Sequence, residues 1–156
     1  MTRLEEIFCA GDVVVGLQAG DKWQAIDRLL DRLVQGGRVP EERSAEVRDA
    51  LIARERSMST GMERGIAIPH AAVDGLDDAI AALGIVTSSE GLEFESIDRE
   101  PTHFVVLLLI PREKKLLHIR TLADIARRLG KEAVRRQLLE SQSADAARAV
   151  LCDAES

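Results

Sequence analysis

Two almost continuous apolar segments lie in the middle of the chain, at residues 79–86 and 104–110. Such runs are typical of central strands that are covered by helices on both faces, because every side chain of the strand is then buried. The second run is far shorter than the roughly 20 residues that a membrane-spanning helix needs, and Pro111 ends it. We therefore expect two buried strands and no membrane insertion.

Two shorter segments also have strand character. Residues 12–17 contain three consecutive valines, and residues 66–68 are Ile-Ala-Ile followed by Pro69. Runs rich in β-branched residues and bounded by turn formers predict strands. We expect the second of these strands to stop at Pro69-His70.

Helical periodicity occupies the rest of the chain. Asp21 is a good N-cap for a helix that Gly36-Gly37 ends, and Pro40 opens a second helix that runs toward Arg56. Three further amphipathic stretches follow Pro111: one that ends at Gly130, one over 131–139, and a last short helix capped by Ser143. Helices before, between and after apolar strands predict a three-layer α/β fold with a mixed, mostly parallel β-sheet flanked by helices.

Length and composition fit a single domain over residues 1–156. Hydrophobic residues make up 46% of the chain and charged residues 31%, with a formal net charge of -6. Because no block of Lys and Arg stands out, the sequence does not predict binding to nucleic acid. The first residues are acidic where a signal peptide would be basic, so we expect a cytoplasmic protein.

Metal, disulfide and nucleotide chemistry have no support in the sequence. Cys9 and Cys152 lie near opposite ends, and the histidines at 70, 103 and 118 lack the spacing of a metal site. Neither a P-loop nor a dinucleotide-binding glycine motif is present. We therefore expect no catalytic metal and no ATP binding.

Residues 54–70 hold the densest concentration of reactive side chains. His70 is predicted to lie just beyond a strand end, where α/β proteins place reactive groups. A neutral imidazole is a competent nucleophile for phosphoryl groups, and Arg54, Ser59 and Thr60 are expected as phosphate neighbours. The alternatives remain open: a histidine after a proline can simply finish a turn, and hydroxyls often bond to the local backbone.

Several motifs, in one order, resemble a known family. They are Arg54-Glu55, Ser59-Thr60-Gly61, residues 65–70 (Gly-Ile-Ala-Ile-Pro-His), Ile97-Asp98 before Pro101, Ile110-Pro111, and His118 four residues before Leu122. The chain is similar over nearly its whole length to enzyme IIA domains of the fructose/mannitol type in the bacterial phosphoenolpyruvate-dependent phosphotransferase system. The region from Ile125 to Ser143 is most similar to the nitrogen-regulatory branch.

The resemblance implies a phosphocarrier with a mixed sheet flanked by helices and no cofactor. His70 matches the phosphorylated histidine of the family, His118 the second active-site histidine close to it, and Arg54 an assisting arginine. Taken alone, His118 is better explained as a polar position on an amphipathic helix. Asp98 is expected to be a turn former, and His103 is assigned no role.

The sequence departs from the family pattern at the turns near these motifs. Where the family often has Thr-Gly-Ile-Gly-Asn-Gly, this chain has Glu63 and Arg64, a pair capable of forming a salt bridge beside the site. Arg99 replaces a frequent glycine, which puts the usual turn geometry in doubt.

The expected function is that of a phosphocarrier that accepts a phosphoryl group on His70 from a histidine phosphocarrier protein of the HPr or NPr type. It would then act on downstream regulated proteins, as in the nitrogen-regulatory branch. One alternative is a fructose- or mannitol-type import component that passes phosphate to a separate IIB protein. An alternative of another class is an interaction module that is not phosphorylated.

Overall fold

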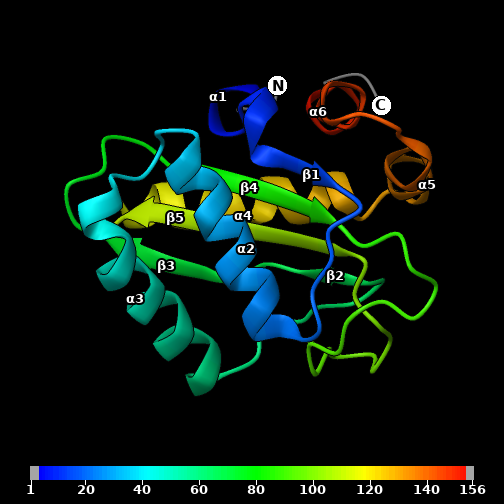
Figure 1. Ribbon diagram of the computed structural model, residues 1–156, viewed down its shortest axis with the longest axis horizontal. Coiled ribbons are helices and arrows are strands. Elements are labelled where there is room, and N and C mark those ends of the chain that lie inside the picture. Colours follow the sequence, from blue (N-terminus) through cyan, green and yellow to red (C-terminus); the bar gives the residue numbers. More distant parts are fainter. Residues whose placement is uncertain (1–3, 154–156) are drawn as a thin grey trace.

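A five-stranded mixed sheet forms the centre of the protein in the computed structural model, which describes residues 4–153 (Figure 1). Strand β5 (Phe104–Pro111) lies inside the sheet, antiparallel to β4 (Ile80–Ile85) on one side. On its other side β5 pairs in parallel with both β2 (Ile66–Ala67) and β3 (His70–Val73). Strand β1 (Val13–Val15) pairs in parallel with β4 at the opposite edge. The expected mixed, mostly parallel sheet is confirmed.

The end of the strand at residue 66 differs from the sequence-based expectation. The chain does not leave the sheet at Pro69-His70, because His70 is the first residue of β3 and lies opposite Leu108 of β5. Pro69 has no N–H to donate and separates β2 from β3, but its carbonyl still accepts from the N–H of Leu108 at 2.9 Å. His70 therefore belongs to an ordered strand rather than to a loop after one.

Helices cover both faces of the sheet, which gives the three expected layers. Helices α2 (Lys22–Gln35) and α3 (Ser44–Ser57) lie in front of the sheet in Figure 1, and α4 (Lys115–Leu129) lies behind it. Helices α5 (Glu132–Glu140) and α6 (Ala144–Cys152) share a core with α4 and with α1 (Leu4–Ile7), a short helix that the hydrophobic pattern did not predict. No helix within residues 4–153 is long and apolar enough to cross a membrane.

Strand β5 divides the interior into two cores. Side chains of a strand alternate between its faces, so Phe104, Val106, Leu108 and Ile110 pack on the α4 side. Val105, Leu107 and Leu109 pack against α2 and α3. All of these residues are buried, as expected for a fully apolar central strand.

Local capping explains where the helices begin and end. Asp21 accepts from the N–H of Gln24 at the start of α2, Ser143 caps α6 by accepting from Ala146, and Gly130 ends α4. Pro40 does not open α3 directly: it precedes the short 3₁₀ turn η2 (Glu41–Arg43), and a second 3₁₀ turn, η1 (Ala10–Asp12), leads into β1.

Candidate functional site

The two histidines that the family resemblance singles out lie side by side. His70 opens β3, and His118, 48 residues later in the chain, lies in the first turn of α4. Their ring centroids are 5.2 Å apart with the ring planes at 73° to each other. The pairing is tertiary, since it depends on the parallel alignment of β3 with β5 and on the return of the chain through α4.

A single hydrogen bond determines which nitrogen of His70 carries the proton. Its Nδ1 lies 2.7 Å from the carbonyl oxygen of Ile68. A carbonyl oxygen can only accept, so the neutral ring carries its proton on Nδ1 and donates it there. The lone pair is then on Nε2, which is the nitrogen available as a nucleophile.

Both rings line an open pocket of about 280 Å³ on the surface. Its remaining walls are the side chains of Arg54 and Arg112 and the small residues Ala50, Ala71 and Ala72. The small residues leave room beside the rings, and the two guanidinium groups supply positive charge. Such a combination suits a tetrahedral anion at the imidazole.

Arg54 lies in the last turn of α3, as expected, and is half-buried. Its Nη1 donates to the carbonyl oxygen of Met58 at 2.8 Å. This bond connects the arginine to the chain that follows the helix, and the side chain reaches the pocket from that position.

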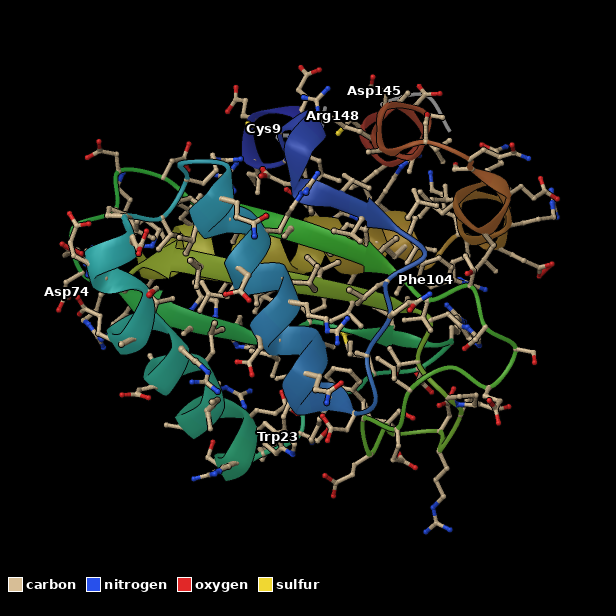
Figure 2. The ribbon with its side chains drawn as sticks, viewed as in Figure 1. Cys9, Trp23, Asp74, Phe104, Asp145 and Arg148 are labelled. Atoms are coloured by element: carbon tan, nitrogen blue, oxygen red, sulfur yellow. The ribbon has the colours of Figure 1, made fainter. Side chains whose placement is uncertain are left out.

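Arg112 was not identified from the sequence. It directly follows β5, where its Nε donates to Asp74 at 2.8 Å and its Nη2 to the carbonyl of Ala72 at 3.2 Å. Asp74 lies beyond the end of β3, beside α3 (Figure 2). Arg112 could have been found only from its position in the chain. Because β3 and β5 are parallel and Val73 pairs with Pro111, the residues that follow these two strands lie next to each other at one edge of the sheet.

The surroundings favour the neutral form of both imidazoles. Burial lowers the pKa of His70 below its ordinary value of 6.5, and the positive charge of Arg54 and the neighbouring His118 lower it further, against the opposing effect of the Ile68 hydrogen bond. Burial and Arg54 also lower the pKa of His118. His70 therefore retains its lone pair at neutral pH.

Ser59 and Thr60, expected as phosphate neighbours, have structural partners instead. The Ser59 hydroxyl donates to the carbonyl of Phe94 and accepts from the N–H of Gly61. The Thr60 hydroxyl is buried and donates to the carboxylate of Glu55. Neither side chain lines the pocket that contains His70. These hydroxyls shape the loop before β2.

The residues that depart from the family pattern do not line the pocket that contains His70. Glu63 and Arg64 are both exposed and, within the described residues, form no ion pair with each other. The N–H of Arg64 donates to Asp98, whose carboxylate also accepts from Glu100, and Asp98 is thus a turn former as expected. Arg99 has a φ of 63°, so it adopts the left-handed conformation that glycine would supply there.

Over residues 4–153 there is no group of three or more His, Cys, Asp or Glu side chains that could hold a metal ion. His103 is half-buried and directly precedes β5, with its Nδ1 2.9 Å from the carbonyl oxygen of Val86. It lines a different pocket, with Arg64 and Pro101. Its local hydrogen bond resembles that of His70, but it lacks the second imidazole.

Comparison with known proteins identifies the family. The sequence model of the family described as "Phosphoenolpyruvate-dependent sugar phosphotransferase system, EIIA 2" matches residues 6–153. The chain belongs to this family. Proteins of the EIIA type 2 family are phosphoryl-transfer components, and the resemblance drawn from the motifs is confirmed.

Relatives in the EIIA type 2 family carry two kinds of name. A fructose-specific EIIA component from Haloferax volcanii is 36% identical over 129 residues, which cover 83% of this chain and 81% of that protein. A nitrogen regulatory protein from Pseudomonas aeruginosa is 29% identical over 153 residues, which cover 98% of this chain and 97% of that protein. The chain spans 22% of the length of a longer relative, a fructose-specific EIIABC component from Bacillus subtilis.

The fold comparison agrees with the family. The crystal structure of nitrogen regulatory protein IIA-Ntr from Neisseria meningitidis superimposes with a TM-score of 0.80 at 27% identity, covering 94% of this chain and 97% of that one. The five-stranded sheet flanked by helices is therefore the EIIA type 2 fold.

Proposed function

We propose that Nε2 of His70 accepts a phosphoryl group from the phosphohistidine of a carrier protein of the HPr or NPr type. The observation that carries the proposal is the His70 ring itself: its Nδ1 is bonded to the Ile68 carbonyl, and it lies beside His118 in an open pocket with two arginines. The family to which the chain belongs supplies the phosphotransferase context.

The step is a direct transfer between two imidazoles. The lone pair on Nε2 attacks phosphorus, the bond from phosphorus to the nitrogen of the donor breaks, and its electron pair returns to the donor ring. The proton on Nδ1 of His70 stays in place, bonded to the Ile68 carbonyl. No external acid or base is required, and catalysis consists of positioning and charge stabilisation.

The pocket provides the charge that the transferred group needs. A phosphoryl group on His70 carries close to two negative charges at neutral pH. Arg54 and Arg112 line the same pocket, and the His118 ring can turn an N–H toward an oxygen of the phosphoryl group. The charge-assisted hydrogen bonds that they form would stabilise both the phosphorylated protein and the transition state.

After phosphorylation, the protein acts as a signalling protein of the nitrogen-regulatory type. Support comes from the P. aeruginosa relative, which matches nearly the full length of both chains, and from the N. meningitidis IIA-Ntr structure. The second candidate is transfer to a separate IIB protein for fructose or mannitol uptake. The 36% identity to the H. volcanii fructose-specific EIIA component favours it.

The test is the intact mass of the protein after incubation with phosphoenolpyruvate, enzyme I and the phosphocarrier protein, without acid because phosphohistidine is acid-labile. Wild type should gain one phosphoryl mass and His70→Ala none. His103→Gln is the matched control, since His103 has the same type of Nδ1 bond to a carbonyl in another pocket; it should label like wild type.

The alternative outcomes separate the remaining hypotheses. If neither wild type nor any variant gains mass although the upstream proteins are shown to be phosphorylated, the chain is an interaction module and the proposal fails. If His70→Ala still labels, another residue is the acceptor. Where wild type labels, transfer onward to purified fructose-type and mannitol-type IIB proteins favours the import role over signalling.

A further inference from the structure

A buried ionic group lies near the end of α3, at the residue that follows Arg54. The Glu55 side chain has no exposed surface and forms a 3.0 Å salt bridge with Lys22 of α2. Lys22 is 8% exposed and also contacts Glu95 at 2.9 Å. Buried charges are costly unless they are paired and hydrogen-bonded, so a group of this kind requires an explanation.

Glu55 connects this ionic group to the loop before β2. The N–H of Thr60 donates to its Oε2 at 3.0 Å, and the Thr60 hydroxyl donates to its Oε1. Both carboxylate oxygens are therefore occupied, and both donors of Thr60 are held by one side chain. Glu55 thus fixes the position of Thr60 and the direction of its peptide groups.

Thr60 in turn holds the residue that orients His70. Its carbonyl accepts from the N–H of Ile68 at 3.2 Å, and the carbonyl of Ile68 accepts from Nδ1 of His70 at 2.7 Å. Between Ile68 and His70 stands Pro69, whose ring limits backbone rotation. The hydrogen bonds run without a break from Lys22 through Glu55, Thr60 and Ile68 to the imidazole.

We infer that Lys22, Glu55 and Thr60 are positioning residues that hold the Ile68 carbonyl where it selects the Nδ1–H tautomer of His70 and so presents the Nε2 lone pair. The inference deepens the proposed function, because it assigns the control of the acceptor nitrogen to side chains that do not line the pocket. If the carbonyl shifts, either nitrogen can carry the proton. A ring with its proton on Nε2 has no lone pair there to attack phosphorus.

The electrostatics of the site are consistent with this arrangement. Glu55 is close enough to raise the pKa of His70, against the larger lowering by burial. Although burial lowers the pKa of Lys22, its hydrogen bonds to Glu95 and Glu55 raise it overall, so the ammonium group stays charged. Trp23, next to Lys22, lies at the start of α2 near the end of α3 (Figure 2), and the Lys22 ammonium is 5.1 Å from its ring centroid. Its fluorescence therefore reports on the same group.

The test compares Thr60→Val, which keeps the shape of the side chain but removes its donor, with Thr60→Ser, which retains the hydroxyl. Proton–nitrogen NMR of the histidine rings gives the tautomer of His70 at a pH where the ring is neutral. Thr60→Val should show a mixture of tautomers and accept phosphate about tenfold more slowly, the cost of a small displacement in a reaction governed by positioning. Thr60→Ser should restore the single tautomer and most of the rate.

Glu55→Gln should have the same effects as Thr60→Val, and Asp12→Asn is its matched control. Like Glu55, Asp12 is a buried carboxylate: it forms an ion pair with Arg38 and accepts a hydrogen bond from the backbone N–H of Cys9. Asp12 lies next to β1, however, at the other edge of the sheet. Asp12→Asn should lower stability without changing the His70 tautomer or the rate.

An unchanged tautomer and rate in Thr60→Val would overturn the inference, even if Glu55→Gln fails to fold. The tautomer measurement needs no phosphate donor. If wild-type protein accepts no phosphate, the proposed function fails, and the NMR comparison still decides whether these residues set the state of the ring.

Discussion

Replacing Arg112 by Gln tests whether the second arginine of the pocket contributes to phosphoryl transfer. In the structure its Nε and Nη2 are bonded to Asp74 and to the Ala72 carbonyl, while within the described part of the chain its Nη1 makes no hydrogen bond. Those two bonds hold the guanidinium at the rim, and Nη1 remains available for an oxygen of the phosphoryl group. Gln keeps much of the length but loses the charge.

The size of the effect follows from the exposure of the side chain. A hydrogen bond to a charged group contributes about 1.5–3 kcal/mol in a buried setting. The Arg112 side chain is 59% exposed, so solvent screening reduces that contribution to about 1 kcal/mol. We therefore expect the rate of phosphoryl acceptance to fall roughly 5- to 10-fold. Arg112→Lys should recover only part of the lost rate, because lysine supplies the positive charge but not the planar set of N–H donors of a guanidinium group.

The assay is rapid-quench transfer of radiolabelled phosphate from the phosphorylated carrier protein. Arg48→Gln is the control: Arg48 is 53% exposed and bonds through Nε to Asp27 of α2, so its loss removes the same charge and the same kind of ion pair. Arg48→Gln should accept phosphate at the wild-type rate. Equal rates for Arg112→Gln and wild type would remove Arg112 from the site.

Four further predictions concern the site and the turns around it. His118→Ala should still accept phosphate on His70 but more slowly, and unchanged forward and reverse transfer rates would exclude a role for His118. Because the pKa of His70 lies below 6.5, phosphoryl acceptance should stay constant as the pH falls from about 8 to about 6.5 and should decline only at lower pH, where the folded ring protonates. Below about pH 6.5 the unfolded state binds the proton first, so the contribution of His70 to the free energy of unfolding should decrease as the pH falls further; a free energy of unfolding that rises between about pH 6.5 and about pH 5.5 would contradict this. Arg99→Gly should raise the free energy of unfolding by about 0.5–1 kcal/mol by removing left-handed strain at φ 63°, whereas a lower urea midpoint would refute it. Gly61→Ala should lower that free energy by about 1–3 kcal/mol, because an added Cβ would lie 2.6 Å from the Phe94 carbonyl oxygen and 2.9 Å from Cα of Ser96; a midpoint equal to wild type would show that the loop can yield.

Local sequence signals were sufficient for most of the fold. The apolar run at 104–110 predicts a strand buried on both faces, and the caps at Asp21 and Ser143 start helices as predicted. The pattern failed at Pro69, because a proline normally ends a strand while here the neighbouring β5 continues the ladder past it. Four residues of α1 are too few for a periodic signal.

The site was only partly accessible from sequence. His70 could be named from its motif, but its partner could not be found by spacing, because His118 reaches it through the packing of α4 on the sheet. Arg112 gives no signal except its place after β5, and the roles of Ser59 and Thr60 depend on Phe94 and Glu55, whose positions are set by tertiary structure. Hydroxyls and arginines near a motif cannot be assigned to a ligand until their other partners are known.

The measurement that tests the central claim most directly is proton–nitrogen NMR of the protein phosphorylated by the carrier. The structure predicts that the phosphoryl group is on Nε2 of His70 and that Nδ1 remains protonated and bonded to the Ile68 carbonyl. Phosphate found on Nδ1 of His70, or on His118 or His103, would contradict the account.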